Sequence, residues 1–143
     1  MAKVYCFGNT SNGELGLGGI EDEQILLPRK QKLSIDCRKY SLKQLCSGRN
    51  HTLVLFRNES DDSSLVLSCG SNERNQLGRE GSWKRLEPID ALSNHVVVRL
   101  CCGSNHSLAL TEAGQIFGWG CNLFGQLGLY FHINKNDLFT YFV

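Results

Sequence analysis

Two histidines are the residues whose repeated placement most suggests chemistry. His51 stands three positions after Gly48 and precedes Thr-Leu-Val-Leu, and His106 stands three positions after Gly103 and precedes Ser-Leu-Ala-Leu. A pair of imidazoles could bind a metal ion or transfer protons. Each histidine, however, occurs once in its own copy of one pattern, beside a hydroxyl residue. We therefore predict that both are structural, with ring nitrogens bonded to nearby backbone, because buried polar groups normally find partners.

The cysteines could suggest a metal site or a disulfide framework. There are seven: Cys6, Cys37, Cys46, Cys69, Cys101, Cys102 and Cys121. The number is odd and no Cys-x-x-Cys pair occurs, which argues against a zinc site. Most of them lie in segments expected to be strands, where a free cysteine behaves as a small buried apolar residue. We predict reduced thiols, since no signal peptide precedes them.

No pattern in the chain indicates a catalytic or cofactor site. The glycine-rich loop at residues 13–19 lacks the Lys-Ser/Thr pair and the following helix of a phosphate-binding loop, and no Gly-x-Ser-x-Gly elbow occurs. The charged clusters are short: Glu59, Asp61 and Asp62 are acidic, and Arg29, Lys30 and Lys32 are basic. Such clusters are typical of solvated surfaces. We predict no catalytic, cofactor-binding or metal-binding residue in this chain.

Length and composition indicate one globular domain. The chain has 143 residues, a formal net charge of +1, 41% hydrophobic residues and 20% charged residues. A net charge of +1 is not the strongly positive charge that a nucleic-acid-binding domain typically carries. No apolar run is long enough to span a bilayer. The first residues lead directly into a predicted strand, without the apolar core of a signal peptide. We expect a cytoplasmic protein that binds neither nucleic acid nor membrane.

Internal repetition organises the chain. One segment occurs three times, at residues 7–16, 69–78 and 119–128, and the copies lie 62 and 50 residues apart. The Gly-x-x-His segment occurs twice, at residues 46–55 and 101–110, which are 55 residues apart. Two long motifs that alternate with a period near 50 residues indicate a repeat architecture.

Short apolar runs bounded by turn residues predict about nine strands and no helix. The expected strands are residues 4–8, 25–27, 42–46, 51–56, 65–69, 88–89, 96–101, 106–110 and 115–119. A polar insertion at residues 58–64 explains the longer first spacing between the loop motifs. The fold class is therefore all-β.

The two motifs resemble the regulator-of-chromosome-condensation repeat, a family of seven-bladed β-propellers. The shared features are a small-Gly-x-x-His-Ser/Thr-Leu-x-Leu strand, an apolar strand ending in aromatic-Gly, and an Asn-x-x-Gly-Gln-Leu-Gly loop. The likeness covers residues 3–128, and the opening residues 4–30 are most similar to the start of a HERC-type HECT ubiquitin ligase. At four strands per blade, the resemblance implies about two to three antiparallel blades.

The resemblance also implies structural roles for the motif residues. Gly48 and Gly103 are expected to permit positive φ or close approach at a hairpin turn. Alternating leucines are expected to face the space between blades, and one leucine is expected to anchor each loop. The leucines of the strands are Leu53, Leu55, Leu108 and Leu110, and those of the loops are Leu15, Leu77 and Leu127.

The resemblance implies a non-catalytic, protein-binding fragment of a HERC-type ubiquitin ligase, whose catalytic HECT domain lies elsewhere in the parent. Two alternatives stay open, because propellers host many functions. One is guanine-nucleotide exchange on a Ran-type GTPase, and the other is a purely structural scaffold. The expected partners are therefore ubiquitin-pathway substrates or a small GTPase.

The repeat pattern stops after residue 128. We assign residues 1–128 to propeller repeats and residues 129–143 to a divergent tail, and we expect a truncated product of a longer gene. The tail holds five of the thirteen aromatic residues: Tyr130, Phe131, Phe139, Tyr141 and Phe142. These aromatics are expected either to cap the last blade or to stay exposed. Open blade faces are expected to promote self-association.

Overall fold

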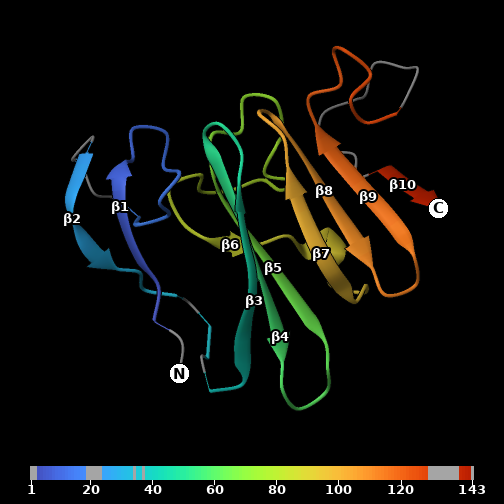
Figure 1. Ribbon diagram of the computed structural model, residues 1–143, viewed down its shortest axis with the longest axis horizontal. Coiled ribbons are helices and arrows are strands. Elements are labelled where there is room, and N and C mark those ends of the chain that lie inside the picture. The colour runs from blue at the N-terminus through green and yellow to red at the C-terminus, as the bar shows by residue number, and fades with distance from the viewer. Residues whose placement is uncertain (1–2, 19–23, 34, 37, 129–138, 143) are drawn as a thin grey trace.

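The fold consists almost entirely of antiparallel strands (Figure 1). The computed structural model describes residues 3–18, 24–33, 35–36, 38–128 and 139–142. The strands are β1 (Tyr5–Asn9), β2 (Gln24–Lys30), β3 (Tyr40–Ser47), β4 (His51–Asn58), β5 (Ser64–Gly70), β6 (Glu87–Pro88), β7 (Val97–Cys102), β8 (His106–Thr111), β9 (Gln115–Gly120) and β10 (Phe139–Phe142). One short 3₁₀ helix, η1 (Asp90–Leu92), connects β6 to β7.

The strands form three sheets in chain order. Strands β3 to β6 make one four-stranded sheet, the first blade, and β7 to β10 make another, the second blade. Strands β1 and β2 make a two-stranded sheet beside the first blade. Every pair of neighbouring strands is antiparallel. The prediction of an all-β chain with about two to three four-stranded antiparallel blades is therefore confirmed.

Each of the nine expected strands is present, and two elements were not expected. Strand β10 pairs with β9 in the register Phe139↔Gly118 and Phe142↔Gln115, so it has the place in its blade that β6 has in the first. Its Phe-Thr-Tyr-Phe sequence suits a strand, but it lacks the proline that heads β6. Residues 129–138 and 143 of the tail lie outside the described residues. The second unexpected element is η1, which buries Leu92.

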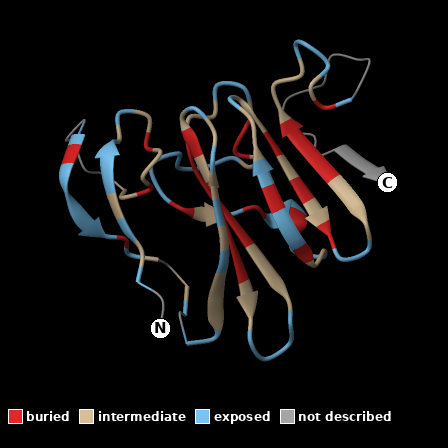
Figure 2. Cartoon of the chain, viewed as in Figure 1, coloured by how far each residue is buried: buried red, intermediate tan, exposed pale blue. Residues whose placement is uncertain are grey.

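The main hydrophobic core lies between the two blades, where buried residues of both sheets face each other (Figure 2). The first blade and the segment after it contribute Leu53, Leu55, Val66, Ile89 and Leu92, and the second blade contributes Val97, Leu100, Ala109, Phe117 and Trp119. At roughly 1.5–3 kcal/mol for each large apolar side chain, this burial is a dominant stabilising term.

Strand parity gives each blade two distinct faces. On β4, Leu53 and Leu55 point toward the second blade, as expected. On β8, Ala109 points back into the shared core, whereas Leu108 and Leu110 are only half-buried. Leu108 and Leu110 face away from the first blade, the side on which a further blade would pack, so the prediction that they lie between two blades is met only in their orientation. Among the described residues, no blade covers them.

A smaller core covers the opposite face of the first blade. It contains Val54, Phe56, Leu67, Cys69 and Leu86, with Leu33, Ile35, Tyr40, Leu42 and Leu65 at its margin. Both faces of the first blade are therefore apolar and both are covered. This is why its middle strands read as continuous hydrophobic runs, Leu-Val-Leu-Phe in β4 and Leu-Val-Leu in β5.

The repeated loops are anchored by leucines, as the motif predicted. Leu77 is 1% exposed and Leu127 is 3% exposed, although both belong to loops. The backbone N–H of Leu77 donates to the side chain of Asn72 at 3.0 Å, and that of Leu127 donates to Asn122 at 2.9 Å. Leu15, in the first copy, is half-buried.

Replacing either buried anchor, Leu77→Ala or Leu127→Ala, should lower the free energy of unfolding by roughly 2–4 kcal/mol, because each leaves a cavity under its loop. Urea denaturation of the purified chain measures the effect. Leu123→Ala is the matched control, since Leu123 lies in the same loop as Leu127 but is exposed; its effect should stay within about 0.5 kcal/mol. An unchanged midpoint for either anchor variant would contradict the buried packing.

Candidate functional site

The motif histidines lie at the turns that join the first two strands of each blade. His51 is only 1% exposed, and its Nε2 lies 2.9 Å from Ser107 Oγ in the second blade. The prediction that its ring bonds nearby backbone is therefore wrong, because its partner is a side chain of the next blade. Its Nδ1 is buried without a hydrogen-bond partner among the described residues. His106, the equivalent residue of the second blade, is half-buried.

The glycine of each Gly-x-x-His turn makes room for the histidine ring. A Cβ built on Gly48 would collide with the ring of His51, and one on Gly103 would collide with the ring of His106. Neither glycine is among the residues with positive φ. Of the two expected roles, close approach is thus the correct one, and a side chain here would displace the imidazole.

A hydrogen-bond network continues from His51 across the blade boundary. The hydroxyl of Ser107 donates to the backbone carbonyl of Gln76 at 2.9 Å, and the indole N–H of Trp119 donates to the same carbonyl at 2.9 Å. Since the Ser107 proton is used there, Nε2–H of His51 must be the donor to Ser107 Oγ. The network therefore connects a turn of the first blade, the loop between β5 and β6 of the same blade, and two strands of the second blade.

The same arrangement occurs one repeat earlier. The hydroxyl of Thr52 donates to the carbonyl of Glu14 at 2.8 Å, and the thiol of Cys69 contacts that carbonyl at 3.4 Å. Thr52 and Cys69 have the places of Ser107 and Trp119, and Glu14 has the place of Gln76. The glycine-rich loop at residues 13–18 therefore serves as a docking loop for the next blade, as its repetition suggested.

The Glu or Gln of each loop motif also closes its own loop. The side-chain oxygen of Gln76 accepts a bond from the Arg74 N–H at 2.8 Å. In the other two copies, Glu14 accepts from Asn12 at 2.8 Å, and Gln126 accepts from Phe124 at 2.9 Å. These polar motif residues are consequently engaged in internal bonds rather than presented to a ligand.

Arg79 is a structural residue that the sequence patterns did not reveal. Its side chain is 6% exposed, and it donates to backbone carbonyls of Ser68, Glu80, Ser82 and Arg85 and to the side chains of Ser68 and Glu87. These bonds hold the segment that follows the second repeated loop, up to Arg85, against Ser68 of β5. The first copy has Leu17 at this position, so no repetition marked it.

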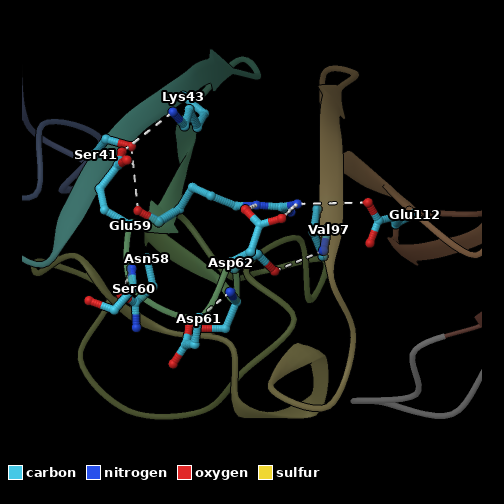
Figure 3. Close-up of polar contacts among 12 residues, drawn as sticks. Ser41, Lys43, Asn58, Glu59, Ser60, Asp61, Asp62, Val97 and Glu112 are labelled. Atoms are coloured by element: carbon cyan, nitrogen blue, oxygen red, sulfur yellow. Dashed lines mark hydrogen bonds and ion pairs between the residues drawn. The ribbon is translucent and has the colours of Figure 1, made fainter.

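The polar insertion, residues 58–64, makes the turn between β4 and β5 at the end of the first blade opposite the repeated loops (Figure 1), and Figure 3 shows its polar contacts. Arg57 binds Asp62 through two hydrogen bonds of 2.6 and 3.0 Å, and Lys43 lies 3.6 Å from Glu59. The hydrogen bonds from Arg57 hold the pKa of Asp62 below its usual value. The acidic cluster borders a hollow of about 640 Å³, but most of its charge is balanced within the chain.

The structure extends the basic cluster predicted at Arg29, Lys30 and Lys32. Arg85, from the segment before β6, joins them around a hollow of about 430 Å³. The residues lining that hollow include no acidic side chain. The cluster is therefore a small basic surface made by two segments that are distant in sequence.

Within the part of the chain that the structure describes, no group of three or more His, Cys, Asp or Glu side chains that could hold a metal ion is found. Cys69 is buried, and burial raises the pKa of its thiol to about 12. Cys101 is exposed, contrary to its expected burial, because it lies on the outer side of β7. The thiols of Cys46 and Cys102 approach to 2.9 Å. Cys37 lies outside the described residues.

Exposed apolar side chains occur on the third repeated loop and also on strands, among them Tyr5 of β1 and Leu26 and Leu27 of β2. Phe124 is 92% exposed, Leu123 beside it is 57% exposed, and Trp83 in the loop region between β5 and β6 is also exposed. Figure 1 shows these loops at one end of the sheets, together with the Gly-x-x-His turns; we call it the motif-loop end. Across the described residues, no helix has the length and apolar character needed to cross a membrane.

Stability should fall as pH falls, because His51 is held neutral. Desolvation, with a smaller contribution from the charge of His106, lowers the pKa of His51 to about 4. Between pH about 6.5 and 4 the unfolded chain binds a proton that the folded chain excludes, which removes up to about 3 kcal/mol of stability. Urea unfolding of wild type and His51→Asn across this range tests it.

The His51→Asn variant should be less stable than wild type at pH 7.5 and should show a shallower loss of stability below pH 6.5. His95→Asn, which changes a histidine outside the network, should keep the wild-type pH dependence. Equal pH slopes in wild type and His51→Asn would contradict a neutral, buried His51.

Two solved structures share this fold. The crystal structure of human WBSCR16 superposes with a TM-score of 0.79 at 28% identity, over 95% of this chain and 35% of that chain. The crystal structure of Prp20p from Saccharomyces cerevisiae, a protein studied for its binding to Gsp1p and histones, gives a TM-score of 0.72 at 25% identity, over 96% of this chain and 34% of that chain. The blades seen here are therefore part of a known β-propeller architecture.

Curated relatives include ubiquitin ligases and exchange factors. The chain is 41% identical to the human probable E3 ubiquitin-protein ligase HERC4, over an alignment of 179 positions that includes 88% of this chain and 16% of the relative. It is 44% identical to human HERC6 over 90 residues, 62% of this chain and 8% of the relative. It is 34% identical to the secretion-regulating guanine nucleotide exchange factor of Bos taurus, over 90% of this chain and 26% of the relative. The chain thus spans a minor part of each relative's length.

Sequence models of one repeat match nearly all of the described blades. The regulator of chromosome condensation (RCC1) repeat matches residues 2–55 and 64–110, and a second model of the same repeat matches residues 97–126. The matched segments include both Gly-x-x-His turns and two of the three loop motifs in full. The chain therefore belongs to the regulator of chromosome condensation (RCC1) repeat family.

Proposed function

We propose that this chain is a non-catalytic, protein-binding propeller segment of a HERC-type ubiquitin-protein ligase, and that it acts in the cytoplasm. The identities to human HERC4 and HERC6 support this assignment. In this proposal the segment holds partner proteins, and ubiquitin transfer takes place on a HECT domain in another part of the parent protein.

The observation that carries the proposal is the contrast between polar and apolar residues at the motif-loop end. The polar motif residues there, such as His51 and Gln76, are occupied by bonds inside the chain. The apolar side chains of Phe124 and Leu123 instead face solvent. Exposed aromatic and aliphatic residues on a rigid scaffold are typical anchors of a protein interface.

Replacing these anchors, Leu123→Asp together with Phe124→Asp, should abolish capture of the partner proteins whose ubiquitylation falls when the parent ligase is inactivated. The measurement is quantitative mass spectrometry of proteins retained on the immobilised chain. The control is Val98→Asp, because Val98 is exposed and lines the hollow near the opposite end of the blades. Both variants should melt like wild type.

If the double variant retained those partners while Val98→Asp lost them, the interface would lie at the end with the insertion. If neither variant changed capture, the exposed loop residues would have no role in binding. Either result would overturn the assignment of the motif-loop end.

A second function, guanine-nucleotide exchange on a Ran-type GTPase, is favoured by the identity to the bovine exchange factor and by the likeness to Prp20p. A third is a purely structural scaffold, with no partner at the loops. The exchange function differs from the ligase-segment function in nucleotide-exchange activity. The scaffold function differs from both because it predicts no partner in the capture experiment.

The chain should not accelerate release of fluorescent GDP from a Ran-type GTPase, because the proposed role is ligase-associated partner binding. It should also form no reducible ubiquitin adduct when incubated with ubiquitin-activating and ubiquitin-conjugating enzymes. A full-length HECT ligase is the positive control for the adduct. Faster GDP release would favour the exchange function, and an adduct on any cysteine would refute the non-catalytic role.

A further inference from the structure

Two cysteines from different blades meet in this structure. Cys46 lies in β3, the first strand of the first blade, and Cys102 lies in β7, the first strand of the second blade. Their sulfur atoms are 2.9 Å apart, although the residues are 56 positions apart in the chain. Both side chains are half-buried and pack against the core between the blades. Neither residue is fully enclosed, which leaves the pair partly open to solvent.

Hydrogen bonds join the two blades on both sides of this pair, one set between β3 and β7 and the other between the turns that follow these strands. On one side, the Gln44 amide donates to the Leu100 carbonyl at 2.7 Å and accepts from the Leu100 N–H at 2.8 Å. On the other side, the Arg49 N–H donates to the Ser104 carbonyl at 3.1 Å. The two sulfurs are thus held together by contacts that do not involve the cysteines themselves.

The chemistry of the pair suits oxidation. A disulfide bond needs the sulfurs only roughly 1 Å closer than they are here. The hydrogen bond between the two thiols lowers the pKa of Cys46 and raises that of Cys102, so Cys46 is the one that ionises more readily. Thiolate character and solvent access are the properties that make a cysteine reactive toward oxidants.

We propose that Cys46 and Cys102 are a redox modification site, at which a peroxide converts the two thiols into a reversible disulfide between the blades. The Cys46 thiolate attacks one peroxide oxygen, the O–O bond breaks, and Cys46 becomes a sulfenic acid as one water is released after protonation. The sulfur of Cys102 then attacks the sulfur of Cys46, and its proton leaves with the hydroxyl as a second water. Two thiols are oxidised by two electrons, and one hydrogen peroxide is reduced to two waters.

The other described cysteines lack this arrangement. Cys69 is fully buried, and burial raises the pKa of its thiol. Cys101 is adjacent to Cys102, but successive strand residues point to opposite faces, so its side chain is directed away from Cys46. The bond should therefore form within one chain and select one pair.

The test uses the full 143-residue chain, reduced and desalted, then treated with equimolar hydrogen peroxide near neutral pH. Remaining thiols are blocked with N-ethylmaleimide, and the digested protein is mapped by mass spectrometry. The expected product is a peptide pair linked through Cys46 and Cys102 within monomers rather than between chains, and reversed by dithiothreitol. The same treatment in concentrated urea should lose the preference for this pair.

Matched variants identify the pair. Cys46→Ser and Cys102→Ser should each abolish the linked peptides, whereas Cys101→Ser and Cys121→Ser should retain them. Oxidised wild type should melt about 5–10 °C higher than reduced wild type, because the bond constrains the unfolded chain, and Cys46→Ser should show no such shift. Three results would overturn the proposal. One is N-ethylmaleimide labelling of Cys46 and Cys102 in oxidised protein that is as complete as that of Cys121. The others are a disulfide between Cys101 and Cys102, and an equal yield of the Cys46–Cys102 peptide pair in urea.

Discussion

The need to cover two apolar faces on every blade constrains the whole structure. A strand such as β4 places Leu53 and Leu55 on one face and Val54 and Phe56 on the other, and all four are buried. A sheet that is apolar on both sides cannot be stable alone in water, so each blade requires neighbours. The short strands, the tight turns and the packed loops all follow from bringing successive sheets face to face.

Packing of apolar faces does not by itself set the register between blades, and a few polar contacts provide it. The carbonyl of Gln76 accepts from two side chains of the second blade, and the carbonyl of Glu14 is contacted in the same way by the first. His51 adds a bond from the turn of one blade to the strand of the next. Because His51, Gln76 and Ser107 are buried, an unpaired partner among them would be costly and a shifted register unfavourable.

Much of the fold could be predicted because the same sequence motifs recur along the chain. Short apolar runs bounded by turn residues located every strand from β1 to β9, and the recurring Leu-Gly loop endings indicated the buried anchors Leu77 and Leu127. The role of Gly48 was predictable only in part, because a glycine at a hairpin turn indicated either positive φ or close approach, and the structure selects close approach.

Features without repetition could not be predicted. The partner of His51 is Ser107, which lies in another blade and becomes a neighbour only through the packing of the sheets. Arg79 replaces a leucine of the first copy, so its buried role had no counterpart in the pattern. Strand β10 lacks the proline that marks the fourth strand of the first blade, and only its pairing with β9 identifies it. The exposed character of Phe124 likewise depends on the final position of its loop.

The parity of β4 and β8 makes each repeat directional. One face carries the leucines of the Leu-x-Leu motif, and the other carries the hydroxyl residue, Thr52 or Ser107, that docks on the preceding loop. Neighbouring blades therefore join head to tail in the described part of the chain. A unit of about 50 residues could be duplicated or deleted in such a gene without altering the mating surfaces on either side. The half-buried Leu108 and Leu110 of the second blade present the same surface that Leu53 and Leu55 offer within the chain.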